Sequence, residues 1–218
     1  MSQITRSVVL TALLLLAGPA IASPAEVAVV DKSGRPLADA VVELFAAGSR
    51  AGSPGLQLPT EAFIDQRHET FLPLVTVVRK GGHVIFTNHD TTMHQVYSFS
   101  PIKQFAFEID EGQRSPPVVF DKAGVAAIGC NIHDRMITYV YAAESSLAGM
   151  TDSKGSAKFA DLPAGKYRGT VWHPQLPQGA ALPSFSLVVA ASGVRTTVAL
   201  PVNGAFASAK KTMHMQMY

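Results

Sequence analysis

Residues 125–136 read Val-Ala-Ala-Ile-Gly-Cys-Asn-Ile-His-Asp-Arg-Met. The first six residues are small, apolar or β-branched, which is typical of a buried β-strand. The rest form a short loop in which Cys130, His133 and Met136 follow one another at a regular spacing. A thiolate, a neutral imidazole and a weak thioether hold copper in an electron-transfer site once a second histidine joins them. His94 is the candidate for that second histidine.

Cys130 is the only cysteine in the chain. In an oxidising compartment a structural cysteine normally has a partner, so a single one indicates a buried inert thiol, an intermolecular bridge or a metal thiolate. The spacing from Cys130 to His133 and Met136 favours the metal thiolate. Taken alone, Met136 is core filler and His94 is a histidine at the end of a strand; together the four residues predict a metal site.

The other histidines offer alternative ligands. His68, His83 and His89 lie near expected strand ends, and each is either a surface residue or a spare ligand. His173 is expected to be structural. Residues 213–217 read Met-His-Met-Gln-Met, which indicates either a disordered terminus or a segment that collects Cu(I) during delivery.

The rest of the chain has a strand-like pattern with no sustained helical period. Short β-branched and aromatic runs are separated by Gly, Pro, Asp and Ser, which predicts an all-β chain of antiparallel β-sandwich architecture. Gly81-Gly82 is expected to be a hairpin turn between two of the strands. Such runs include 26–30, 40–45, 72–79, 83–88, 94–99, 117–120, 125–130 and 137–142.

Two separated stretches share a known pattern. Residues 26–45 contain Asp-Lys-Ser-Gly-Arg-Pro-Leu between two apolar runs, and residues 151–172 contain Thr-Asp-Ser-Lys-Gly and Leu-Pro-Ala-Gly-Lys-Tyr. They resemble the first and second halves of a carboxypeptidase-regulatory-like β-sandwich. That resemblance implies that the intervening residues are a second domain inserted at a loop, where insertions are tolerated. The alternative is two consecutive domains with an irregular first strand.

Within the insert the sequence resembles cupredoxins of the plastocyanin/amicyanin kind. Residues 71–90 look like the paired strands of that family, His94 opens the next strand at the position of the upstream copper histidine, and Cys130-x-x-His133-x-x-Met136 has the spacing of amicyanins. The whole chain is similar to periplasmic cupredoxin-like proteins labelled methylamine utilization proteins, a label that does not establish a role in methylamine metabolism.

Two neighbours of the ligands differ from the amicyanin pattern. Gln95 follows His94 where amicyanins have an asparagine that braces the ligand loop, and the loop from Asn131 to Arg135 contains no proline. We expect Asn131 to supply the bracing hydrogen bond. These differences affect the reduction potential and rigidity of the site more than copper binding itself.

The N-terminus predicts export. Arg6 precedes an apolar run over residues 8–17 that is too short to span a bilayer, and Ala20-Ile21-Ala22 places small residues where a signal peptidase cleaves. We expect cleavage after Ala22 and a periplasmic location; the alternatives are a membrane anchor or a buried helix. Cleavage removes Arg6 from 18 Lys and Arg and none of the 16 Asp and Glu, which leaves a net charge of +1. No basic stripe indicates nucleic-acid binding, and no later apolar run is long enough to cross a membrane.

The expected domain organisation has five parts. They are a signal peptide at 1–22, the first half of the regulatory-like sandwich at 23–59, an inserted cupredoxin domain at 60–143, the second half at 144–205 and a tail at 206–218.

The expected function is that of a mononuclear blue-copper protein carrying single electrons. Cys130, His94 and His133 would form the equatorial plane and Met136 the axial bond. His133 would be the exit for the electron, ringed by Ile132, Arg135, Phe99 and Pro101. The partner would be another periplasmic redox protein, such as a c-type cytochrome or a dehydrogenase. The alternatives are a copper carrier or sensor without redox turnover, and a metal-free structural sandwich. An enzyme is not expected, because four protein ligands leave no open coordination position.

Overall fold

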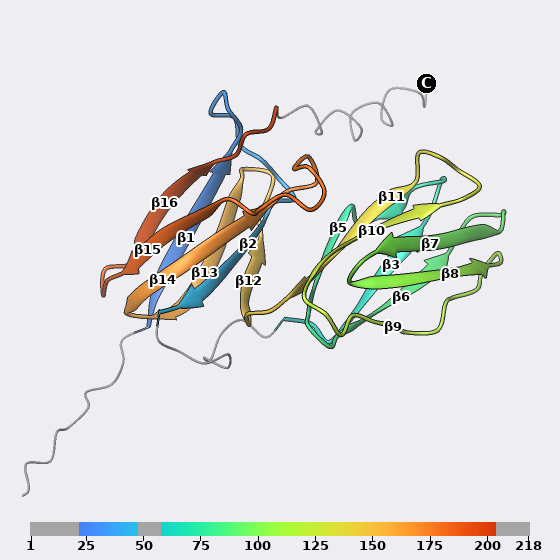
Figure 1. The fold of residues 1–218 in the computed structure, drawn as a ribbon, viewed down its shortest axis with the longest axis horizontal. Coiled ribbons are helices and arrows are strands. Elements are labelled where there is room, and N and C mark those ends of the chain that lie inside the picture. Colours follow the sequence, from blue (N-terminus) through green and yellow to red (C-terminus); the bar gives the residue numbers. More distant parts are fainter. Residues whose placement is uncertain (1–21, 48–57, 204–218) are drawn as a thin grey trace, which may run out of the picture.

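The computed structural model describes residues 22–47 and 58–203. Every regular element in these ranges is a β-strand, and the strands form four sheets. The sheets form two β-sandwiches, which lie side by side in Figure 1. The prediction of an all-β fold built from β-sandwiches is confirmed.

The first sandwich, here the flanking sandwich, combines strands from both ends of the described chain. One sheet has the order β13-β1-β16 and the other β12-β2-β14-β15. Their strands are β1 (Ala22–Val30), β2 (Val41–Ala46), β12 (Leu147–Met150), β13 (Ser156–Pro163), β14 (Gly165–Trp172), β15 (Ser184–Val189) and β16 (Val194–Ala199). Alternating apolar residues of the two sheets meet in one core that includes Val27, Leu44, Phe159 and Leu187.

The second sandwich, here the central sandwich, is built from the residues between β2 and β12. Its sheets have the orders β5-β11-β10-β7-β8 and β4-β3-β6-β9. Its strands are β3 (Glu61–Gln66), β4 (Phe71–Leu72), β5 (Val75–Arg79), β6 (His83–Asn88), β7 (His94–Ser100), β8 (Lys103–Ile109), β9 (Val118–Val119), β10 (Gly124–Cys130) and β11 (Ile137–Ala143). Both sheets contribute to one core, in which Phe71, Phe86, Phe120 and Ile128 are almost fully buried.

Among the described strands no ladder joins the central sandwich to the flanking one. We retain the insertion boundaries 23–59, 60–143 and 144–205 as a proposal.

A buried contact nevertheless packs the two sandwiches against each other. Trp172 of β14 meets Tyr139 and Tyr141 of β11 at ring-centroid distances of 5.3 and 6.0 Å. The Tyr141 hydroxyl donates a 2.7 Å hydrogen bond to Oε2 of the buried Glu43 in β2. Burial and the negative charge of Glu43 raise the pKa of Tyr141, so the phenol keeps its proton and remains a donor.

Most strand pairs are antiparallel, as the sequence predicts, but three described pairs are parallel. β5 runs parallel to β11, β3 runs parallel to β6, and β1 runs parallel to β16. Each parallel pair joins strands separated by at least one crossover, which periodicity along one strand does not reveal.

The prediction that Gly81-Gly82 forms a hairpin turn is wrong. The turn exists, with Gly82 N–H donating to the Arg79 carbonyl at 2.8 Å and a φ of 84° at Gly81. The strands on either side of it, β5 and β6, belong to different sheets. The turn carries the chain from one layer of the central sandwich to the other.

Several strand boundaries also differ from those expected. The expected strand 72–79 is divided into β4 and β5 around Pro73, which has no N–H for a ladder. β3 and β8 of the central sandwich are not among the expected strands, and neither are β12, β15 and β16 of the flanking sandwich. β8 reads Lys-Gln-Phe-Ala-Phe-Glu-Ile, and its charged and polar residues conceal an alternation in which Phe105 and Phe107 face the core.

The expected signal peptide lies outside the described residues except for Ala22, which is the first residue of β1, and the methionine-rich tail lies outside them entirely. Within the described ranges, no helix has the length and apolar character needed to cross a bilayer.

Candidate metal centre

Two neighbouring strands bring His94 and Cys130 together. His94 is the first residue of β7 and Cys130 is the last residue of β10. The two strands pair antiparallel, with Cys130 opposite Val96 and Gly129 opposite Tyr97. The beginning of one strand therefore lies beside the end of the other, and the two side chains meet at one end of the central sandwich.

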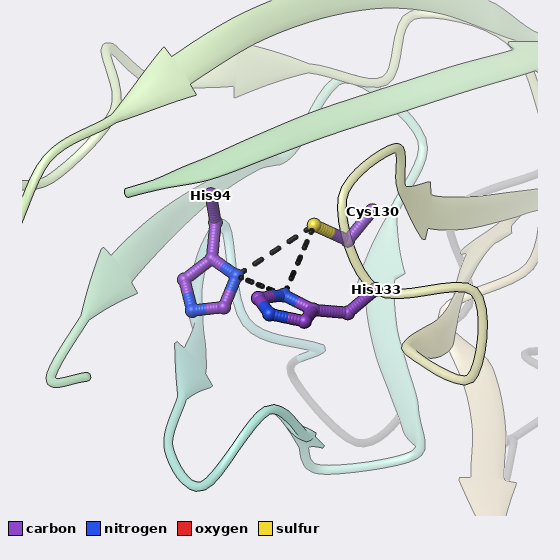
Figure 2. A group of neighbouring side chains, drawn as sticks. All are labelled: His94, Cys130 and His133. Carbon is purple, nitrogen blue, oxygen red and sulfur yellow. Dashed lines mark hydrogen bonds between the residues drawn. The ribbon is translucent and has the colours of Figure 1, made fainter. Parts of the chain in front are cut away.

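The loop between β10 and β11 adds the third side chain. Figure 2 shows the Sγ atom of Cys130 and the Nδ1 atoms of His94 and His133 pointing toward one another. Sγ lies 3.6 Å from Nδ1 of His94 and 4.0 Å from Nδ1 of His133, and the two nitrogens are 3.3 Å apart. A circle through three atoms with these separations has a radius of about 2.1 Å, which lies within the range of about 2.0–2.3 Å for metal bonds to imidazole nitrogen and thiolate sulfur.

The three donors differ in their exposure to solvent. His94 is 0% exposed and Cys130 is 3% exposed, whereas the His133 side chain retains 21% of its surface. Met136 is 3% exposed and belongs to the same core cluster as Cys130. The structure thus brings together three of the four predicted ligands as a donor cluster and places Met136 in the adjoining core. His133 is the edge of the cluster that faces solvent.

Hydrogen bonds hold the loop that carries His133. Asn131 N–H donates to the Gln95 carbonyl at 2.9 Å, and Nδ2 of Asn131 donates to Oε1 of Gln95 at 2.6 Å. At the other end of the loop, Met136 N–H donates to the His133 carbonyl at 3.0 Å. The expected bracing role of Asn131 is therefore present as a bond to Gln95.

Asp90, which the sequence analysis missed, orients His94. Its Oδ2 atom lies 2.9 Å from Nε2 of His94 and accepts the ring N–H. The carboxylate also accepts the amide N–H groups of His68 and Glu69, and Asp90 N–H donates to Oδ1 of Asn88. Burial raises the pKa of Asp90, but the hydrogen bonds from Glu69, His94 and His68 outweigh it and hold that pKa below its usual value.

Glu69, also missed, faces the other histidine. Its Oε1 atom lies 3.5 Å from Nε2 of His133. Glu69 lies in the turn between β3 and β4, far from His133 in the sequence. The sequence offers one indication for Asp90, which ends the Asn-His-Asp stretch at 88–90 and lies four residues before His94. Glu69 had none.

The carboxylates beside Nε2 favour Nδ1 as the metal-binding nitrogen, through a hydrogen bond at His94 and through a 3.5 Å ion-pair contact at His133. A histidine whose Nε2–H points at a carboxylate carries its free electron pair on Nδ1. In both His94 and His133 the Nδ1 atom faces Sγ of Cys130. Two imidazole electron pairs and a sulfur directed at one point form a soft and borderline donor set that suits copper, so the residues present fit a copper ion.

The alternative histidine ligands lie elsewhere. Nδ1 of His89 contacts Oδ1 of Asp65, and Nε2 of His83 is 2.9 Å from Oε2 of Glu61. The described metal-type cluster contains none of His68, His83 and His89. His173 is buried, which lowers its pKa, and its Nδ1 accepts the Gln175 N–H at 3.2 Å.

A surface groove of about 390 Å³ lies beside the cluster. It is lined by Tyr97, Phe99, Pro101, Cys130 and Met136 among others, but not by His133. Phe99 is 76% exposed. It therefore lines this groove together with Cys130 and Met136.

No model of a protein family matches the chain, and no curated protein matches it. Solved structures do. The chain is similar to a purple cupredoxin from Nitrosopumilus maritimus, with 23% identity, 38% of this chain and 99% of that chain covered, and a TM-score of 0.34. It is similar to amicyanin from Paracoccus versutus, with 14% identity, coverage of 46% and 98%, and a TM-score of 0.34. It is also similar to a copper-containing nitrite reductase from Thermus scotoductus, with 21% identity and a TM-score of 0.36; this match covers 47% of this chain and 25% of that chain.

Proposed function

We propose that this chain is a periplasmic, mononuclear blue-copper protein that carries single electrons between redox partners. The observation that carries the proposal is the triangle formed by Sγ of Cys130 and the Nδ1 atoms of His94 and His133, whose size matches the bonds of one metal ion. Copper bound there supplies a one-electron Cu(II)/Cu(I) couple. Met136, buried beside the triangle, is the proposed weak axial ligand.

The scaffold suits electron transfer because it restricts movement of the donors. His94 and Cys130 belong to paired strands of one sheet, and the loop that carries His133 is tied to β7 through Asn131 and Gln95. Donors fixed in this way change position little when the charge at the centre changes. A centre that reorganises little exchanges electrons rapidly.

The exposure of the site favours a carrier over an enzyme. His94, Cys130 and Met136 are buried, and only the edge of His133 reaches solvent. Electron transfer needs no more than such an edge, whereas a substrate needs an open coordination position. The proposed partner is a periplasmic redox protein, such as a c-type cytochrome or a dehydrogenase, that makes a small transient contact at His133.

The decisive measurement is an optical titration of the mature protein with Cu(II). We expect one equivalent of copper to produce an intense charge-transfer band from the Cys130 thiolate and a blue or purple colour. A pale ligand-field spectrum with tight binding would instead support a copper carrier based on histidine. No binding at all would leave a metal-free structural sandwich.

Met136→Leu tests the axial bond. Methionine and leucine have similar volumes, so the apo protein should lose about 1.5 kcal/mol of stability or less. The variant should keep its colour and have a higher reduction potential. Its Cu(II) affinity should fall by no more than about 10-fold, which is the lower end of the loss caused by removing a residue that supports a metal ligand. Voltammetry and a competition titration measure both quantities. Loss of all copper binding would contradict a merely axial role.

A further inference from the structure

The turn between β3 and β4 has an unusual backbone. Arg67 N–H donates to the Thr70 carbonyl at 3.0 Å, and the two residues between them, His68 and Glu69, have φ angles of 53° and 51°. Two consecutive left-handed residues form a turn that strongly favours Asn and Gly, because a side chain at either position is strained. A simple connection between two strands does not require His and Glu at these positions.

This conformation directs two main-chain donors at one acceptor. The amide N–H groups of His68 and Glu69 both donate to the carboxylate of Asp90, which accepts the Nε2–H of His94. The turn thereby fixes the carboxylate that orients the buried histidine of the metal centre.

The same turn also reaches the exposed histidine. The Glu69 side chain is 63% exposed, and its carboxylate lies 3.5 Å from Nε2 of His133. Glu69 is therefore linked to His94 by hydrogen bonds through its amide and Asp90, and its carboxylate contacts His133 directly. Within the described residues, the His94–Asp90 and His133–Glu69 pairs are the two carboxylate contacts of the donor cluster.

We propose that Glu69 is a positioning residue that clamps the two histidines of the metal centre and sets its preference for Cu(II). The inference rests on the proposed function. A carboxylate at Nε2–H holds the imidazole ring in place and makes Nδ1 a stronger donor. A negative charge at the edge of the centre also favours the more positive oxidation state of copper, which lowers the reduction potential. Because Glu69 is exposed, this charge effect weakens as salt is added.

Glu69→Gln removes the charge and keeps the size of the side chain. We expect the reduction potential of the copper protein to rise and the dissociation constant for Cu(II) to increase by about 10-fold, the lower end of the range for such partners. The melting temperature of the apo protein should be unchanged. Glu69→Asp should partly restore the wild-type potential.

The matched control is Glu61→Gln. Glu61 also contacts the Nε2 of a histidine, His83, at 2.9 Å, and this pair lies outside the metal cluster. The control removes the same charge from an equivalent pair and should leave the potential and the Cu(II) affinity at their wild-type values.

A double variant, H68N/E69G, separates the effect of the backbone conformation from the effect of the Glu69 carboxylate. Asn and Gly accept the left-handed conformation without strain, so the apo protein should melt at a higher temperature. Its potential should nevertheless rise as in Glu69→Gln, because the carboxylate is absent. If Glu69 had only a structural role, replacing it would not both raise the melting temperature of the apo protein and change the reduction potential of the copper protein.

The outcomes distinguish the inference from the proposed function. If Glu69→Gln matches Glu61→Gln in both potential and Cu(II) affinity, the clamp is overturned. If the wild-type protein gives no charge-transfer band, the proposed function fails, and ¹⁵N NMR of the apo protein then decides the inference. The clamp expects the Nε2–H tautomer of His133 to be more populated in the wild type than in Glu69→Gln. Equal tautomer populations of His133 in the two proteins would overturn the clamp.

Discussion

His94→Ala should abolish copper binding at the proposed centre. His94 supplies one of the three converging donor atoms and is fully buried. Its loss opens an equatorial position that no other histidine of the described chain is placed to fill. Loss of a residue that only supports a metal ligand weakens binding by about 10–100-fold. Loss of the ligand His94 itself should raise the Cu(II) dissociation constant by more than this, and the charge-transfer band should disappear. A copper titration followed by absorbance measures both effects.

His89→Ala is the matched control. His89 also contacts a carboxylate, that of Asp65, and it lies close to His94 in the sequence but outside the donor cluster. It should bind copper as the wild type does, and so should His68→Ala. Free imidazole should restore part of the colour to His94→Ala by entering the vacated position. A normal spectrum for His94→Ala together with a failed His89→Ala would transfer the ligand role to His89.

Cys130→Ser should remove the charge-transfer band completely. The band requires a thiolate bound to copper, and Cys130 is the only cysteine in the chain. A serine hydroxyl has nearly the same shape but does not ionise near neutral pH and is a poor ligand for copper. Any copper that the variant still binds through His94 and His133 should be almost colourless and bound with far lower affinity.

The folding of this variant is checked without copper. Burying a hydroxyl in place of a thiol costs about 1–3 kcal/mol where no new hydrogen bond forms, so the apo protein should melt at a lower temperature but remain folded. Circular dichroism and thermal melting of the apo forms establish this. An intense band in folded Cys130→Ser would exclude the thiolate from the site and overturn the proposed function.

Most of the donor cluster was predictable because its residues lie close together in the sequence. Cys130, His133 and Met136 lie on one strand end and the loop that follows, so their spacing limits where they can point. His94 required one additional step, that a strand beginning at 94 lies beside a strand ending at 130. The pairing of Cys130 with Val96 provides that register.

The residues around the ligands were not predictable in the same way. Glu69 approaches His133 only because β3 and β4 belong to the second sheet of the central sandwich and their turn reaches the end where the ligands lie. Asp90 is near His94 in the sequence, yet its contact with the ring depends on the amides of His68 and Glu69. Likewise, the turn at Gly81-Gly82 was recognisable, but whether it joins two strands of one sheet or two sheets depends on the pairing of β5 with β11.

The sequence alone therefore determined the all-β class and most of the side chains that form the donor cluster, since these depend on residue identity and short-range spacing. The tertiary structure decided which nitrogen of each histidine faces the thiol, which edge of the centre meets solvent and which carboxylates hold the rings. Those properties depend on atoms that approach one another from different sheets. Spacing along the chain constrains a strand and its loop, but contacts between layers arise only when the sandwich closes.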